Sequence, residues 1–130
     1  MFIYTIKYGN INIKYGKGVK NMLEPVFGNV TVEKILFALE VYGQAYPAGL
    51  AKLFGIPVNG VQQQLKRLED GSVVVSLIIG RTRLYQFNPR YTFLKELKAL
   101  IQKALQYLPE KEIQKYYVKR TRPRRKGKPL

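Results

Sequence analysis

Within residues 1–21, apolar and polar side chains alternate over residues 4–15, a period of two that is typical of β-strands. The pair Gly9-Asn10 interrupts the alternation and is a two-residue hairpin signal. Pairing across this turn places six apolar side chains on one face: Tyr4, Ile6, Tyr8, Ile11, Ile13 and Tyr15. Because a lone hairpin is marginal in water, two interpretations stay open. Either the hairpin docks elsewhere on the protein, or residues 1–21 are a dispensable extension ahead of Met22.

The period becomes helical from Thr31 onward. Thr31 is the expected N-cap of a helix that ends before Gly43, with an apolar stripe of Val32, Ile35, Leu36 and Leu39. Residues 48–54 are expected to form a second, short helix that points Leu50, Leu53 and Phe54 inward. The tripeptide Gly55-Ile56-Pro57 predicts a turn, because Gly adopts positive φ and Pro starts a helix well. A third helix then follows over residues 58–69, and Asp70-Gly71 ends it.

The apolar, β-branched run at residues 73–79 predicts a strand. Residues 80–83 are expected to turn the chain, and residues 84–87 to return as a second strand. A long helix is predicted over residues 92–108, and Pro109 restarts a short helix that runs to about residue 118.

This order of elements predicts an α+β winged helix-turn-helix, with a three-helix core, a two-stranded wing and a long C-terminal helix. We expect three parts: an N-terminal extension at 1–21, a winged-helix domain at 22–118, and a basic, disordered tail at 119–130.

The third helix is the expected recognition element. A helical wheel places Val58, Val61, Leu65 and Leu68 on the buried side. The amide side chains of Asn59, Gln62 and Gln63 match the paired donor and acceptor on the major-groove edge of adenine. Lys66 and Arg67 suit flanking phosphates, and Gly60 allows a close approach to the groove. The alternative for these residues is an ordinary solvated helix face.

The wing tip is the second expected contact. Arg81, Thr82 and Arg83 stand at the hairpin tip, where cations reach a phosphate or a narrow minor groove. A solvated turn is the alternative interpretation.

The formal charge of +15 favours a polyanionic partner. Its distribution is uneven, because residues 22–118 contain twelve cations and eight carboxylates, a net +4. Seven cations lie in the tail: Lys119, Arg120, Arg122, Arg124, Arg125, Lys126 and Lys128. Such a segment tracks a phosphate backbone without sequence selectivity, or else it only aids solubility. Tyr116 and Tyr117, just before the tail, are expected to pack in the last helix and not to stack on bases.

Composition also excludes several functions. Without Cys or His, the chain lacks the usual soft-metal ligands and the commonest general base, so we expect no metal, no cofactor and no enzymatic activity. No apolar run is long enough to span a membrane, and the N-terminus does not form a signal-peptide core. We therefore expect a cytoplasmic protein.

Over about residues 22–108 the sequence resembles small prokaryotic winged-helix regulators of the ArsR-like class, most closely at residues 50–87, which read LAKLFGIPVNGVQQQLKRLEDGSVVVSLIIGRTRLYQF. The resemblance implies a homodimeric transcription regulator that binds double-stranded DNA. It also implies that the long helix contributes to the dimer, through Leu94, Leu97, Ile101, Leu105 and Leu108. Metal sensing is not implied, since the chain has no Cys or His. Binding to structured RNA or the ribosome, or service as an antitoxin-like protein-interaction module, are the alternatives.

Overall fold

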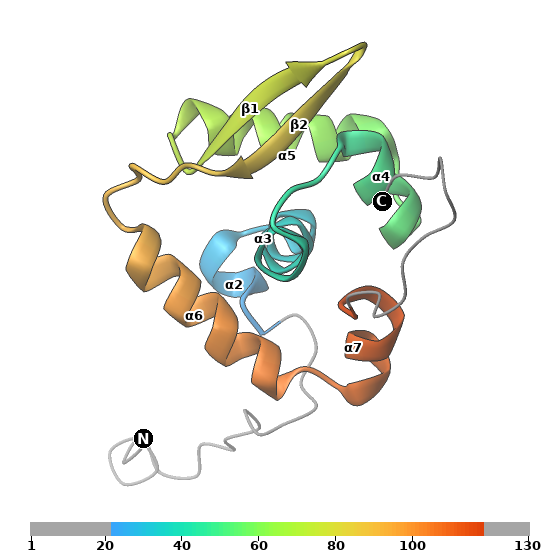
Figure 1. The fold of residues 1–130 in the computed structure, drawn as a ribbon. Helices are drawn as coiled ribbons and strands as arrows, with labels where there is room; N and C mark the ends of the chain where they lie inside the picture. The colour runs from blue at the N-terminus through green and yellow to red at the C-terminus, as the bar shows by residue number, and fades with distance from the viewer. Residues whose placement is uncertain (1–21, 119–130) are drawn as a thin grey trace, which may run out of the picture.

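The computed structural model describes residues 22–118. The predicted N-terminal hairpin and the basic tail lie outside the described residues. Figure 1 shows helices packed around one central helix, with a two-stranded ribbon along one side. The elements are α2 (Glu24–Phe27), α3 (Val30–Tyr42), α4 (Pro47–Phe54), α5 (Val58–Asp70), β1 (Val74–Ile79), β2 (Thr82–Phe87), α6 (Leu94–Tyr107) and α7 (Glu110–Tyr116). The α+β winged-helix prediction is confirmed.

The start of α3 differs from the prediction. Asn29, and not Thr31, is the N-cap, because its side-chain oxygen accepts a hydrogen bond from the Val32 amide at 3.1 Å. Thr31 lies inside the first turn of the helix. The short helix α2 was not predicted, since its four residues are too few to display a helical period.

Helix α3 is the centre of the fold. Its five consecutive residues 35–39 are all buried, which is impossible for a helix that is covered on one side only. Helices α2, α4, α5 and α6 all contact it, and Figure 1 shows α3 nearly end-on among them. The sequence pattern indicated a single apolar stripe, but Phe37 and Ala38 extend the buried surface around the helix.

The turn between α4 and α5 agrees with the prediction. Gly55 ends α4 with φ +66°, a left-handed conformation that a residue with a Cβ rarely adopts. Pro57 is extended and precedes the first residue of α5. The two helices therefore pack at a fixed angle, and both use buried side chains, Leu50 of α4 and Val61 of α5, to contact the core.

The ribbon is antiparallel, with a register that runs from Val74 opposite Phe87 to Ile79 opposite Thr82. Only Gly80 and Arg81 form its turn, so Thr82 and Arg83, which we expected in the turn, belong to β2. Gly80 has φ +63°, which this tight turn requires. Midway along β2, Tyr85 forms two backbone hydrogen bonds of 2.9 and 3.0 Å with Ala45.

Helices α6 and α7 cover the remaining sides of α3. Lys98 of α6 lies 2.7 Å from the Glu40 carboxylate of α3. From α7, the ring of Tyr116 packs 5.1 Å from that of Phe54, and Tyr117 is buried. The prediction that Tyr116 and Tyr117 are packing residues is confirmed. None of the helices between residues 22 and 118 reaches the length and apolarity needed to cross a bilayer.

One carboxylate is buried in this core. Glu33 of α3 is 3% exposed, and its Oε1 accepts a hydrogen bond from the Leu23 amide at 2.7 Å. This bond ties the beginning of α2 to the first turn of α3. Burial raises the pKa of the Glu33 carboxyl, and the backbone amides of Leu23 and Glu24 offset only part of that rise.

A raised pKa means that the folded state holds the Glu33 proton more tightly than the unfolded state does. The resulting stability is fully present below the ordinary pKa of 4.5 and is lost as the pH rises through the folded-state value. The loss in the free energy of unfolding amounts to about 1.4 kcal/mol for each unit by which folding raises the Glu33 pKa. We expect Glu33→Gln to show no such loss, because glutamine keeps an oxygen acceptor and does not titrate. Urea unfolding from pH 4 upward measures it. Glu96→Gln, an exposed change on α6, is the control, and equal profiles for the two variants would contradict the prediction.

Candidate nucleic-acid interface

Helix α5 separates a buried side from a broad polar side. Val61 and Leu65 are fully buried and Leu68 is half-buried, as the helical wheel predicted. The opposite side exposes polar and charged side chains, namely Asn59, Gln62, Gln63, Lys66, Arg67 and Asp70. Gly60 lies at the edge of this surface, and a Cβ at Gly60 would meet no atom within 4 Å.

Val58 is not a core residue, and its assignment to the buried side is wrong. Its side chain is 40% exposed. It is the first residue of α5, directly after Pro57, and the core contains Val61 and Leu65 of this helix but not Val58. The helical wheel predicted a buried Val58 because its angle matches that of Val61 and Leu65. A wheel does not show that the first residue of a helix can lie outside the core.

The three consecutive glutamines have different surroundings. Gln64 is half-buried and accepts a hydrogen bond from Arg67 Nη1 at 3.4 Å. Within residues 22–118, the exposed side chains of Gln62 and Gln63 have no hydrogen-bond partner, and neither does that of Asn59. The residues expected to contact bases are therefore the ones whose amides are free.

The cations of α5 are engaged weakly. Lys66 pairs with Asp70 at 3.0 Å, but the two side chains are 74% and 66% exposed. An exposed i,i+4 pair of this kind contributes only about 0.3–0.5 kcal/mol. A phosphate can therefore replace Asp70 as the partner of Lys66 at little cost.

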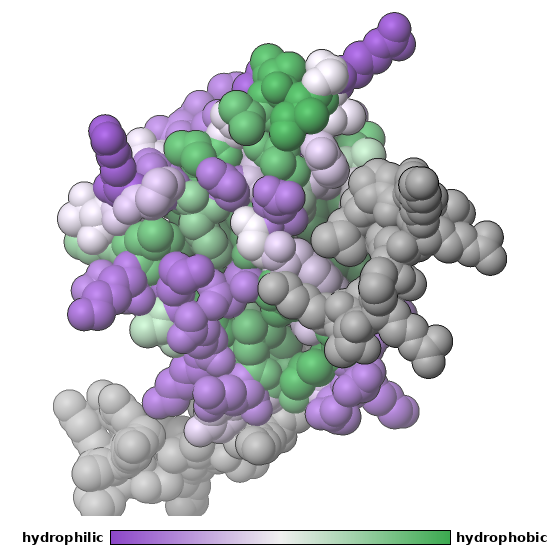
Figure 2. Space-filling model, in the orientation of Figure 1, coloured by the Kyte–Doolittle hydropathy of each residue, from purple (hydrophilic) through white to green (hydrophobic). Residues whose placement is uncertain are grey.

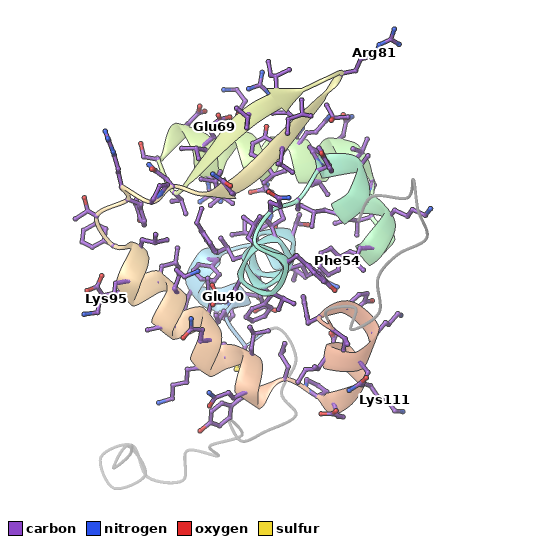
Figure 3. The ribbon with its side chains drawn as sticks, in the orientation of Figure 1. Glu40, Phe54, Glu69, Arg81, Lys95 and Lys111 are labelled. Carbon is purple, nitrogen blue, oxygen red and sulfur yellow. The ribbon has the colours of Figure 1, made fainter. Side chains whose placement is uncertain are left out.

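The two strands of the wing carry different chemistry. Strand β1 ends in three exposed aliphatic residues, Leu77, Ile78 and Ile79, and apolar surface lies near the wing tip in Figure 2. The cations are Arg81, at the turn, and Arg83, which is opposite Ile78 on β2. Arg81 extends from the tip into solvent in Figure 3. The Thr82 hydroxyl donates to the Ile79 carbonyl at 3.0 Å and closes the turn.

A chain of polar contacts connects the wing to the end of α5. Arg83 Nη1 donates to the Ser76 hydroxyl at 2.9 Å, and Ser76 donates to Glu69 Oε2 at 2.6 Å. Each wing strand contributes one residue and α5 contributes the third. Arg83 was expected only to contact DNA. In the structure it also bonds across the wing to Ser76, the residue that links the wing to α5 through Glu69. The other guanidinium N–H groups of Arg83 stay free of protein partners in residues 22–118.

These elements enclose a groove of about 570 Å³ between α5 and the wing. Its walls are Val58, Gln62, Lys66 and Glu69 from α5, Arg81, Thr82, Arg83 and Tyr85 from the wing, and Tyr46, Pro47 and Ala48 at the start of α4. Three cations and one carboxylate thus face it. Burial, followed by the charge of Glu69, raises the pKa of the Tyr85 phenol, so this group stays protonated and can donate a hydrogen bond.

Four residues of this groove were not predicted from the sequence. Tyr46, Pro47 and Ala48 come from the start of α4, and Tyr85, which is opposite Ser76, comes from β2. Tyr85 was recognisable only as a strand residue, and no local pattern reports that the start of α4 lies beside α5. The expected tail contacts Arg120, Arg122, Arg124, Arg125 and Lys126 lie outside the described residues. Within residues 22–118 no cluster of carboxylates is arranged to hold a metal ion.

The expected dimer residues on α6 require a correction. Ile101 is 0% and Leu108 6% exposed, because both pack inside their own chain, so neither can meet a second chain. Leu94, Leu97 and Leu105 are half-buried, and Leu97 and Leu105 pack against the same core. The exposed apolar side chains are Phe93, at 60%, and Leu100, at 39%.

The fold resembles that of solved winged-helix structures. A cysteine-to-serine mutant of MarR from E. coli matches with a TM-score of 0.51 and 17% identity, over 64% of this chain and 61% of the MarR chain. The AntR antimony-specific transcriptional repressor matches with a TM-score of 0.49 and 29% identity, over 65% of this chain and 78% of that one. The chain therefore spans less than two thirds of MarR, and that likeness concerns the fold alone. No family profile and no curated protein sequence matches the chain.

Proposed function

We propose that this chain is a cytoplasmic transcription regulator that binds double-stranded DNA, reads bases through α5 and grips the backbone through its wing. The main support for the proposal is that amide side chains without a hydrogen-bond partner lie on α5, beside a groove that three cations line. Free amides match base edges, while cations match phosphates. A merely solvated helix face would not require the cationic wall that the wing adds.

The proposed docking places the N-terminal half of α5 in the major groove. Asn59, Gln62 and Gln63 then face base edges. Gly60 supports this orientation, because no contact within the described chain requires a glycine there. Glycine costs up to about 1 kcal/mol relative to alanine in a helix, so we assign Gly60, in the first turn of α5, to close approach of the DNA backbone.

The groove between α5 and the wing fits the sugar–phosphate strand that separates a major groove from the next minor groove. Lys66 and Arg83 face that strand from opposite walls, with Arg67 on the outer side of α5 for a neighbouring phosphate. Arg81 extends past it toward the minor groove, with Thr82 beside it. A narrow minor groove has an enhanced negative potential that attracts such an arginine.

Selection of DNA sequences at fixed salt tests this proposal. We expect one enriched motif, and we expect Gln63→Ala to relax the preference at one base position and to weaken binding to the best site by about 5- to 150-fold. Gln64→Ala is the matched control, because this neighbouring glutamine is half-buried and bonded to Arg67. It should leave the motif unchanged.

Two outcomes would reject this proposal. One is the absence of any enriched motif for the wild-type chain. The other is competition by structured RNA that equals competition by the best duplex DNA at the same salt.

The basic segment supplies a separate, sequence-independent contribution in this proposal. Removal of residues 119–130 takes away seven cations, among them Arg120, Arg122, Arg124, Arg125 and Lys126. We expect affinity for all DNA to fall alike, and the slope of log K against log salt to become shallower by about 0.9 for each phosphate that is no longer neutralised. Fluorescence anisotropy over a salt series measures both quantities. A changed motif, or an unchanged slope, would contradict this role.

We further propose that the chain acts as a homodimer through the apolar surface that Phe93, just before α6, and Leu100 of α6 expose. Two α5 helices about 34 Å apart would then read an imperfect palindrome. Leu100→Lys should convert the dimer to a monomer, because it buries an unpaired charge in the interface. Ala99→Lys, which adds the same charge at the neighbouring exposed position, should not. Sedimentation velocity distinguishes the two, and a dimer that survives Leu100→Lys would disprove this interface.

A further inference from the structure

An uncharged strip lies where the first turns of α4 and α5 border the groove. Pro47, Ala48 and Val58 form its apolar part, and Gln62 follows Val58 by one turn of α5. Val58 is 40% exposed although it is a β-branched aliphatic residue, and Ala48 is also exposed. The charged residues of the same helix face, Lys66 and Glu69, come only in the later turns.

This strip carries no cation that could neutralise a phosphate. Its aliphatic side chains and its amide match the groups that an A·T base pair presents. An A·T pair presents a thymine methyl group and, on adenine, an adjacent donor and acceptor in the major groove. An aliphatic side chain packs against the methyl group, and a glutamine amide bonds both adenine atoms. A G·C pair offers no methyl group to the aliphatic side chain.

The spacing along α5 matches two neighbouring pairs. Residues four apart are separated by about 6 Å along a helix axis and face the same direction. Successive base pairs are about 3.4 Å apart. Val58 and Gln62 therefore address adjacent or next-adjacent pairs, while Pro47 and Ala48 extend the apolar contact on the Val58 side.

We propose that Val58 and Gln62 form one specificity element that selects A·T pairs, with Val58 against a thymine methyl group and Gln62 on an adenine edge. This inference rests on the proposed DNA-binding function and adds to it a residue, Val58, that the helical pattern assigned to the core. It also proposes that the first turns of α5 select sites that contain A·T pairs.

The test uses the preferred duplex and replaces its thymines one at a time by deoxyuridine, which removes the C5 methyl group and keeps the pairing. For the full-length wild-type chain, one replacement in each half-site should weaken binding about fourfold, the effect of one buried methyl group. Val58→Ala should bind the thymine site more weakly and should no longer distinguish uracil from thymine there. Val58→Thr, which retains one methyl group, should keep part of the discrimination.

The amide is tested in the same way. Replacement of the neighbouring adenine by 7-deazaadenine removes the N7 acceptor and should weaken wild-type binding, whereas Gln62→Ala should be insensitive to it. Val26→Ala is the matched control, because Val26 is a more exposed valine, at 69%, on α2 and outside the groove. It should preserve both discriminations, and circular dichroism checks that each variant is folded.

The outcomes separate this inference from the function on which it rests. A preferred motif in which no thymine methyl group matters overturns the inference and leaves sequence-selective DNA binding intact. Discrimination against uracil that persists in Val58→Ala, with the protein folded, overturns it as well. The absence of any preferred sequence rejects the proposed function and this inference together.

Discussion

The burial of α3 on all sides is the constraint on which the rest of the structure depends. A helix with five consecutive buried residues is stable only when several elements cover it at once, so α2, α4, α5 and α6 have to pack around it. That requirement fixes α4 and α5 relative to each other before any partner binds. It also explains the buried Glu33, whose hydrogen bond from the Leu23 amide holds the start of α2 on this helix. The outer face of α5 is polar because its inner face is committed to α3.

The wing, in contrast, has no core of its own. A two-stranded ribbon is marginal in isolation, and the outer half of β1 is exposed. Its base is fixed by the buried Val74, and its middle by the backbone pairing of Tyr85 with Ala45. Opposite Tyr85, Ser76 adds a direct link to α5 through Glu69, and Arg83 of β2 bonds to Ser76. The groove between wing and helix is therefore formed in the protein alone, and a pre-formed site lowers the ordering cost of binding.

Period and turn chemistry were sufficient to predict the order of the elements from α3 to α7, because the α4–α5 turn and the wing turn have local signals in Gly55 and Gly80. The errors occurred where tertiary context decides. Val58 has the helical angle of a core residue but lies beyond the end of the core, whereas Ile101 and Leu108 are covered by their own chain. Asn29 caps α3 although Thr31 is also an acceptable N-cap. No local pattern could bring Tyr46 and Tyr85 into one groove, because their proximity depends on how β2 pairs with the segment before α4.

Under the proposed function, the distribution of charge along α5 separates base recognition from electrostatic attachment. Its first turns carry no charged side chain, Lys66 and Arg67 follow, and Glu69 and Asp70 come last. Under the proposed function, a polyanion is attracted to Lys66 and Arg67 and repelled at the end of the helix, which leaves the uncharged first turns to approach the bases. Contacts made by Val58 and by free amides release no counterions, whereas cations that neutralise phosphates do. Under the proposed function, salt therefore controls how tightly the protein is held on any DNA. The preference for one sequence over another depends on neutral side chains that salt affects far less.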